Sequence, residues 1–228
     1  MYWLDDSCIE FPATHLALDE PNGLLAIGGD LSPDRLINAY CHGIFPWYNE
    51  DEEQNILWWT PSPRAVIIPD QLHISRSFSK FLRNTAYTHS FNRDFPAVLS
   101  ACQAPRATQD GTWIGSAMKD AYVQLHQQGF AHSIEIWDAD NRLVGGLYGL
   151  ALGRVFFGES MFSRTPNASK CALYHLCNVL IEKEFSLLDC QVESPHIMRM
   201  GAILLNRNDF EYWLRQAINT HTSLKTTF

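Results

Sequence analysis

An aspartate and a glutamine stand two residues apart within an apolar stretch near the C-terminal end of the sequence. Residues 187–192 (LLDCQV) are typical of a buried β-strand, and side-chain alternation places Asp189 and Gln191 on one side, roughly 7 Å apart. A carboxylate in apolar surroundings is costly unless it has a partner, which favours either a structural ion pair or a catalytic task. Beside an amide, it could orient an incoming amine or relay its proton.

A second acidic residue lies among aromatic residues in the segment 156–162 (FFGESMF). Glu159 is the one charged residue of this segment, and Gly158 permits close approach of a ligand or of another backbone segment. The composition fits a hydrophobic pocket with one polar group at its wall. A plain sheet core with a tethered glutamate fits it equally well.

A third feature is a row of cations on the predicted helix 75–84. Arg76, Lys80 and Arg83 fall within about 60° of one another around the helix axis, while Phe78 and Phe81 lie on the opposite side. Such a row often marks only a solvated helix face. It can also follow a phosphate backbone, and it is distinctive here because the rest of the chain is acidic.

Composition limits the class of protein. The 228 residues include 17 lysine and arginine residues against 25 aspartate and glutamate residues, for a formal net charge of -8, which excludes a general nucleic-acid binder. A hydrophobic fraction of 46% predicts a folded chain, and no apolar run is long enough for a transmembrane helix. The N-terminus lacks the layout of a secretory signal, so we expect a cytoplasmic protein. Six scattered cysteines are expected to be reduced, and no spacing of cysteine or histidine predicts a metal site.

The elements that must position these side chains alternate between helix and strand. A helix is predicted to begin with Ser32 as its N-cap and to end at Gly43. The turn-rich first part of the chain ends at Pro61-Ser62-Pro63, which predicts domains 1–62 and 63–228. Together these signals predict an α+β fold with an antiparallel meander. Further helices are expected at 75–84, 94–103, 116–128, 167–184 and 209–217, and strands at 65–69, 133–137, 143–152, 154–162 and 187–192.

The glycines Gly145 and Gly146 suggest a phosphate-binding loop, and with Arg142 they resemble the pyrophosphate loop of acetyl-CoA-dependent N-acetyltransferases. Such loops need a helix to follow, whereas here another strand is predicted. Cys190 near His196 is a weak candidate for a thiol nucleophile, because no orienting group is visible.

Eight short segments, in order, resemble the bacterial leucyl/phenylalanyl-tRNA–protein transferases. They are residues 20–31 (EPNGLLAIGGDL), 43–48 (GIFPWY), 57–64 (LWWTPSPR), 73–77 (HISRS), 111–114 (GTWI), 158–163 (GESMFS), 167–170 (NASK) and 189–191 (DCQ). The resemblance implies a small N-terminal domain packed on a larger GNAT-like domain with a mostly antiparallel mixed sheet. It also implies transfer of Leu or Phe, with Met left open, from aminoacyl-tRNA to an N-terminal Arg or Lys of an acceptor protein, which marks the acceptor for N-degron degradation.

The resemblance also assigns roles to residues. Asp189 and Gln191 would orient or activate the acceptor amine, and Trp47 and Trp113 would hold the terminal adenosine of the tRNA. Cations on the helix 75–84 would contact the tRNA acceptor stem. No metal, CoA or ATP is implied, because the ester is already activated, and a monomer is expected. The resemblance implies a pocket for the amino-acid side chain at Leu147, Phe156, Gly158, Glu159, Leu173, Leu176 and Leu180, with Ser194 on the acceptor side of the substrate site. The implied tRNA contacts are Arg76, Lys80 and Arg83.

The chain departs from the family pattern at two places. Leu147, Leu176 and Leu180 replace bulkier or softer side chains, which leaves the choice between Leu and Phe open. After the Asp-Cys-Gln segment, relatives usually carry an Asn-Asp-His run, whereas this chain reads Glu193-Ser194-Pro195-His196, so the acceptor subsite can differ. Two alternatives stay open from the sequence: a CoA-dependent N-acetyltransferase and a non-catalytic module that binds tRNA 3′ ends.

Overall fold

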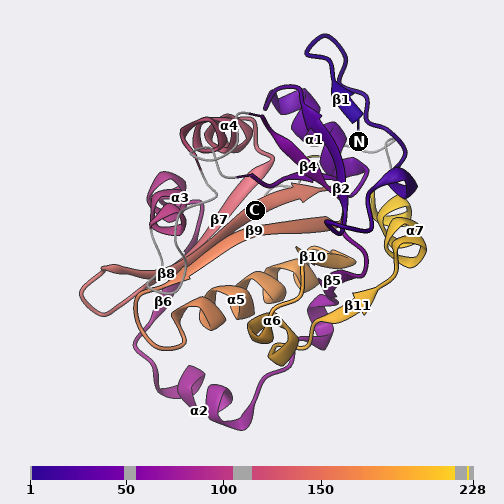
Figure 1. Cartoon of the computed structure of the whole chain (residues 1–228). Coiled ribbons are helices and arrows are strands. Elements are labelled where there is room, and N and C mark those ends of the chain that lie inside the picture. Colours follow the sequence, from indigo (N-terminus) through magenta and orange to yellow (C-terminus); the bar gives the residue numbers. More distant parts are fainter. Residues whose placement is uncertain (1, 49–54, 105–114, 219–224, 226–228) are drawn as a thin grey trace.

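The computed structural model describes residues 2–48, 55–104, 115–218 and 225 (Figure 1). Its strands form two sheets, one of four strands in the order β1-β2-β4-β3 and one of seven in the order β11-β5-β10-β9-β8-β7-β6. The small sheet comprises β1 (Tyr2–Leu4), β2 (Leu24–Gly28), β3 (Phe45–Pro46) and β4 (Leu57–Trp59). The large sheet comprises β5 (Arg64–Ile67), β6 (Thr88–Phe91), β7 (Ala131–Trp137), β8 (Leu143–Leu152), β9 (Val155–Ser163), β10 (Leu187–Gln191) and β11 (Ile203–Leu205).

The large sheet confirms the predicted α+β class and the mostly antiparallel, mixed pairing. β6, β7, β8 and β9 form the expected antiparallel meander, and β10 is antiparallel to β5. β10 runs parallel to β9, which makes the sheet mixed. Among the described residues, no helix is both long and apolar enough to cross a membrane.

Several helices begin where the sequence predicts, and the predicted N-cap Ser32 is confirmed. The helix α1 (Pro33–Cys41) follows Ser32, whose side chain accepts the N–H of Arg35, and Gly43 takes the left-handed conformation beyond its end. α2 (Arg76–Asn84) and α3 (Phe95–Gln103) are capped in the same way by Ser75 and Asp94. The remaining helices are α4 (Ser116–Gln127), α5 (Ala168–Glu182), α6 (Pro195–Arg199) and α7 (Arg207–Ala217), with short 3₁₀ turns at Thr14–Leu16 and Pro69–Gln71.

Helices cover both faces of the large sheet (Figure 1). Leu147 packs into the cluster beneath α5, whereas Tyr148, the next residue of β8, packs with residues of α3 and α4. A methyl group on Gly145 would lie 2.5 Å from the Cβ of Ala168, so glycine lets α5 approach the sheet closely. Gly145 and Gly146 lie inside β8, and β9 follows, so they form no phosphate loop.

The two sheets share one apolar core. Leu25, Tyr40 and Trp58 of the first part of the chain belong to the same buried cluster as Tyr148 and Leu214. The chain therefore passes from the small sheet to the large one near residue 62, but the apolar core is continuous across that point. The division into domains 1–62 and 63–228 stays a prediction. The same holds for a GNAT-like arrangement of the larger part.

Candidate active site

A cavity of about 300 Å³ opens between β3 of the small sheet and strands β9 and β10 of the large one. Helices α5 and α6 complete its wall. Its volume is at the lower end of the range usual for small-molecule sites. The cavity is lined by Phe45, Pro46, Trp47, Leu147, Tyr148, Gly158, Glu159, Ser160, Met161, Leu173, Leu176, Leu188, Cys190, Gln191, Val192, Ser194 and Ile197.

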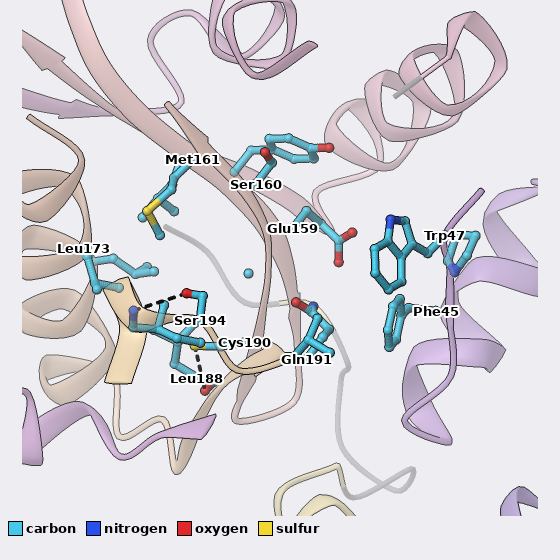
Figure 2. Close-up of a pocket in the computed structure, with 17 residues that line it drawn as sticks. Phe45, Trp47, Glu159, Ser160, Met161, Leu173, Leu188, Cys190, Gln191 and Ser194 are labelled. Carbon is cyan, nitrogen blue, oxygen red and sulfur yellow. Dashed lines mark hydrogen bonds between the residues drawn. The ribbon is translucent and has the colours of Figure 1, made fainter. Parts of the chain in front are cut away.

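The two ends of the cavity differ in chemistry. Figure 2 shows Leu173 and Met161 at one end, and Glu159, Gln191 and Trp47 gathered at the other. Leu173 and Leu176 reach the apolar end from α5, on the helix stripe that the sequence indicates. An apolar group can therefore be held at one end while a polar reaction takes place at the other.

Asp189 lies behind the cavity wall and does not line it. Its carboxylate is fully buried and forms a two-pronged ion pair with Arg64 of the adjacent strand β5, with Arg64 Nε 2.9 Å from Oδ1 and Nη2 2.7 Å from Oδ2. The rings of Phe45 and Phe210 lie 4.8 and 4.7 Å from the guanidinium carbon. The carboxylate that the strand pattern singles out thus has a structural ion pair.

Gln191 lines the cavity, and the prediction that it shares one side of the strand with Asp189 is wrong. A register shift between Asp189 and Gln191 interrupts the alternation, and Gln191 has a φ of 59°. Its backbone N–H donates to Asp189 Oδ1 at 2.9 Å. Its buried Nε2 has no hydrogen-bond partner among the described residues, so the amide can donate to a group in the cavity.

Glu159 is the acidic side chain among the described residues that line the cavity. The hydroxyl of Tyr40 on α1 donates to Oε1 at 2.7 Å, and that of Tyr122 on α4 donates to Oε2 at 2.8 Å. Burial raises the pKa of Glu159 to about 7. The two hydroxyls oppose the rise, the charge of Asp189 adds to it, and Arg64 opposes it.

The carboxyl of Glu159 and the two phenols form one hydrogen-bonded cluster. The hydroxyl oxygens of Tyr40 and Tyr122 lie 2.5 Å apart, so three oxygen–oxygen contacts join the two phenols and the carboxylate. Two phenols supply two hydrogens, and burial raises their pKa well above 10, so they stay protonated. Because burial raises the pKa of Glu159 to about 7, this cluster can take up and release one proton near neutral pH.

Trp47 stands at the cavity mouth with 42% of its surface exposed. Its ring lies 5.7 Å from that of Trp59, and the Trp59 indole N–H donates to the backbone oxygen of Trp47 at 2.6 Å. An exposed indole held in this way can stack with a planar ring. Trp113, the second tryptophan of the prediction, lies outside the described residues.

The remaining predicted pocket residues divide into wall and core. Leu147, Gly158, Leu173 and Leu176 line the cavity, as do Glu159 and Trp47. Phe156 and Leu180 do not line it; both are fully buried in the cluster around α5. Ser194 reaches the cavity, but its hydroxyl accepts the N–H of Ile197 as the N-cap of α6 (Figure 2).

The three predicted cations lie on α2, away from the cavity lining. Arg76, Lys80 and Arg83 are exposed, while Phe78 on the other face is buried and stacks on Phe81. The structure thus confirms the two-sided helix. What binds its basic face is a separate question.

Sequence reasoning missed Arg64, Phe45, Tyr40 and Tyr122. Arg64 follows a proline at the start of a predicted strand, and Tyr40 lies on the apolar side of a predicted helix, so neither position looks unusual locally. A buried acidic residue signals that a basic partner exists, but it does not indicate which one.

The cavity places an apolar end beside a titratable carboxyl and an amide, which is typical of an enzyme that holds an apolar group next to a reacting polar one. Comparisons with known proteins give the family. The family model described as "Leucyl/phenylalanyl-tRNA protein transferase" matches residues 66–215. A second model, described as the N-terminal domain of the same transferase, matches residues 29–62. The chain belongs to the leucyl/phenylalanyl-tRNA–protein transferase family of aminoacyltransferases.

Curated relatives agree over nearly the whole chain. A leucyl/phenylalanyl-tRNA–protein transferase of Pseudomonas fluorescens (strain Pf-5) is 54% identical over 217 residues, which cover 95% of this chain and 95% of that protein. One of Cellvibrio japonicus is 53% identical over 212 residues, 93% of this chain and 89% of that protein. Among solved structures, L-PGS from Bacillus licheniformis aligns with 75% of this chain and 54% of its own at 12% identity and a TM-score of 0.40, too low to assign a fold family.

Proposed function

We propose that this protein transfers leucine or phenylalanine from aminoacyl-tRNA to the N-terminal Arg or Lys of acceptor proteins. The observation that carries the proposal is the two-ended cavity: an apolar end beside Leu173 and Met161, and a polar end at Glu159, Gln191 and Trp47. The transferred residue would mark its acceptor for degradation by the N-degron route in the cytoplasm, and the enzyme would act as a monomer without metal, CoA or ATP.

The aminoacyl end of the tRNA occupies the cavity in this proposal. The leucine or phenylalanine side chain enters the apolar end against Leu147, Leu173 and Leu176, whose burial keeps water out. The terminal adenosine stacks on the exposed ring of Trp47, with Trp113 as its second support. The ester carbonyl then lies between them, close to Gln191.

The chemistry is attack of the acceptor amine on the ester carbonyl. A new C–N bond forms, the bond to the tRNA 3′ oxygen breaks, and the amine must lose a proton. Glu159 is the group at the polar end that can accept it, since its pKa is about 7. The proton can then pass to the departing 3′ oxygen, while the Gln191 amide orients the amine or the carbonyl.

The basic face of α2 is proposed to contact the tRNA acceptor stem. Arg76, Lys80 and Arg83 form a local track on a chain of net charge -8, whose acidic remainder suits an acceptor that begins with Arg or Lys. Replacing Arg76 with alanine should weaken tRNA binding and lower the slope of log affinity against log salt by about one. Filter binding between low and moderate salt measures this slope, and an unchanged slope would remove Arg76 from the contact.

We also propose that residues 1–62 form a small N-terminal domain and residues 63–228 a GNAT-like domain. The change from one sheet to the other near residue 62 and the two family matches, 29–62 and 66–215, support this division. Limited proteolysis tests it, because cleavage between separable domains should occur near residue 62. Cleavage spread over both halves would contradict it.

A transfer assay separates this proposal from the alternatives. Peptides that begin with Arg, Lys or Ala are incubated with radiolabelled Leu-, Phe- or Met-tRNA, and label in the peptide is measured. Transfer to the Arg and Lys peptides is expected. Binding of deacylated tRNA without label transfer would indicate a non-catalytic RNA-end-binding module. Turnover of acetyl-CoA would indicate an N-acetyltransferase, for which Gly145 and Gly146 inside β8 offer no pyrophosphate loop.

A further inference from the structure

The buried cluster behind the cavity wall brings together residues from distant parts of the chain. Arg64 begins β5, Asp189 lies on β10, Phe45 lies on β3 of the small sheet, and Phe210 lies on α7. Arg64 is 1% exposed and contacts the other three. Arg64 therefore joins both sheets and α7.

We propose that Arg64 is a positioning residue for the transfer reaction, acting through Asp189 on Gln191 and through Phe45 on the wall beside Trp47. The inference rests on the proposed function, because it concerns the geometry of that same cavity.

The first route runs from Arg64 to Gln191. The guanidinium fixes both carboxylate oxygens of Asp189, at 2.9 and 2.7 Å, and Oδ1 of the same carboxylate accepts the backbone N–H of Gln191 at 2.9 Å. That backbone has a φ of 59°, a conformation that a residue other than glycine rarely holds without support. The ion pair thus holds the unusual backbone that directs the Gln191 amide to the cavity.

The second route runs from Arg64 to the cavity mouth. The Phe45 ring faces the guanidinium at 4.8 Å, and Phe45 lines the cavity two residues before Trp47. A planar guanidinium can stack between two rings and bind a carboxylate at its edge simultaneously, which a lysine ammonium cannot do. Both walls of the polar end are therefore set by one side chain that does not itself line the cavity.

The test compares Arg64→Lys and Arg64→Met with the wild type in the Leu-tRNA transfer assay, with thermal unfolding of each protein measured in parallel. Because a misplacement of about 1 Å can cost about 100-fold in rate, kcat should fall about 100-fold in Arg64→Met and less in Arg64→Lys. The KM for Leu-tRNA should change much less than kcat, since the apolar end and α2 are untouched and only the adenosine stack at Trp47 depends on Phe45. A folded Arg64→Met protein with wild-type kcat, or one in which only KM rises, would overturn the inference.

Arg35 is the matched control. It is fully buried, pairs with Asp30 (Nε to Oδ1, 3.4 Å) and does not line the cavity. Arg35→Lys should lower the unfolding temperature but leave kcat unchanged at a temperature where the protein is folded. Equal losses of kcat in the two lysine variants would show that Arg64 supports only the fold.

A double-mutant cycle separates the two routes. If the effect passes through Asp189, adding Arg64→Met to Asp189→Asn should lower kcat much less than it does in the wild type. Fully additive losses would exclude the first route. If Arg64→Met does not fold, Phe210→Leu provides the test, because it keeps the Arg64–Asp189 ion pair but loosens the packing of the guanidinium between the Phe45 and Phe210 rings. This variant should lower kcat several-fold, and an unchanged kcat would contradict the inference. Absence of transfer by the wild type would instead refute the proposed function.

Discussion

Asp189 and Glu159 are both carboxylates next to the cavity, but their partners differ in kind. Asp189 accepts three N–H groups, two from Arg64 and one from the backbone of Gln191, and has no surface in the cavity. Glu159 accepts two phenol O–H groups, has no cationic side chain bonded to it among the described residues, and faces the cavity. Asp189 is thus held in an ion pair with the Arg64 guanidinium, whereas burial raises the pKa of the Glu159 carboxyl to about 7.

The difference assigns separate tasks to the two groups. A carboxylate that is fully paired and closed off from substrate can hold geometry but cannot receive a proton from an amine in the cavity. A carboxyl with a pKa near the working pH can do so. In the proposed mechanism, proton transfer is therefore assigned to Glu159 and positioning to Asp189, although the strand pattern alone draws attention to Asp189.

The largest expected effect is that of Asp189→Ala. Removing one partner of a buried ion pair leaves Arg64 uncompensated, which typically costs 3–5 kcal/mol of unfolding free energy. Transfer activity should also be lost, because the Gln191 backbone loses its acceptor. Denaturant unfolding and the transfer assay measure the two effects.

The surface pair Asp140–Arg142 provides the control for that measurement. Arg142 Nη1 lies 3.2 Å from Asp140 Oδ2, and the side chains of Asp140 and Arg142 are 66% and 73% exposed. Asp140→Ala should therefore lower the free energy of unfolding by less than about 1 kcal/mol and leave transfer unchanged. Equal losses of unfolding free energy in the two alanine variants would show that the Asp189–Arg64 ion pair does not stabilise the fold more than a surface pair does.

The second effect is that of Glu159→Gln on turnover. Loss of a general base typically lowers the rate 10²- to 10⁴-fold, so kcat should fall by about this much. In the wild type, kcat should rise as pH increases through about 7, because only the ionised carboxylate accepts a proton. A pH profile of kcat at saturating Leu-tRNA measures this rise, which should be absent in the variant. A variant that keeps wild-type kcat would return the proton-transfer task to another group.

Some of this site could be predicted from the sequence and some could not. The caps Ser32, Ser75 and Asp94 act within three residues, so their helices were predicted correctly. The contacts of Glu159 with Tyr40 and Tyr122 span 119 and 37 residues, and that of Arg64 with Asp189 spans 125. No local pattern encodes such pairings. The strand pattern of Asp189 and Gln191 also assumes an unbroken alternation, which the register shift interrupts.

A third, smaller effect concerns the apolar end, where neither carboxylate acts. Leu173→Ala should enlarge the cavity and shift preference towards Phe, and Gly158→Ala should narrow it and shift preference towards Leu. A Cβ on Gly158 would lie 3.5 Å from its nearest neighbours, an ordinary contact, so the fold should accept it. Differences of one or a few carbon atoms typically change selectivity about tenfold or more.

Competition between Leu-tRNA and Phe-tRNA gives the ratio of kcat/KM for each variant. Opposite shifts in the two variants would separate the choice of amino acid from the chemistry at the polar end. Shifts in the same direction would place the amino-acid side chain elsewhere.

The smallest effect is on stability and follows from the raised pKa of Glu159. Between about pH 4.5 and about 7 the folded protein keeps a proton on Glu159 that the unfolded chain has released. This stabilisation is fully present below pH 4.5 and is lost as pH rises through about 7. Glu159→Gln cannot ionise, so its unfolding free energy relative to the wild type should increase with pH, on the order of 1 kcal/mol after allowing for solvent screening. Thermal unfolding at pH 5.5 and 8.5 measures the trend, and a difference that does not change with pH would mean that Glu159 stays ionised in the folded protein.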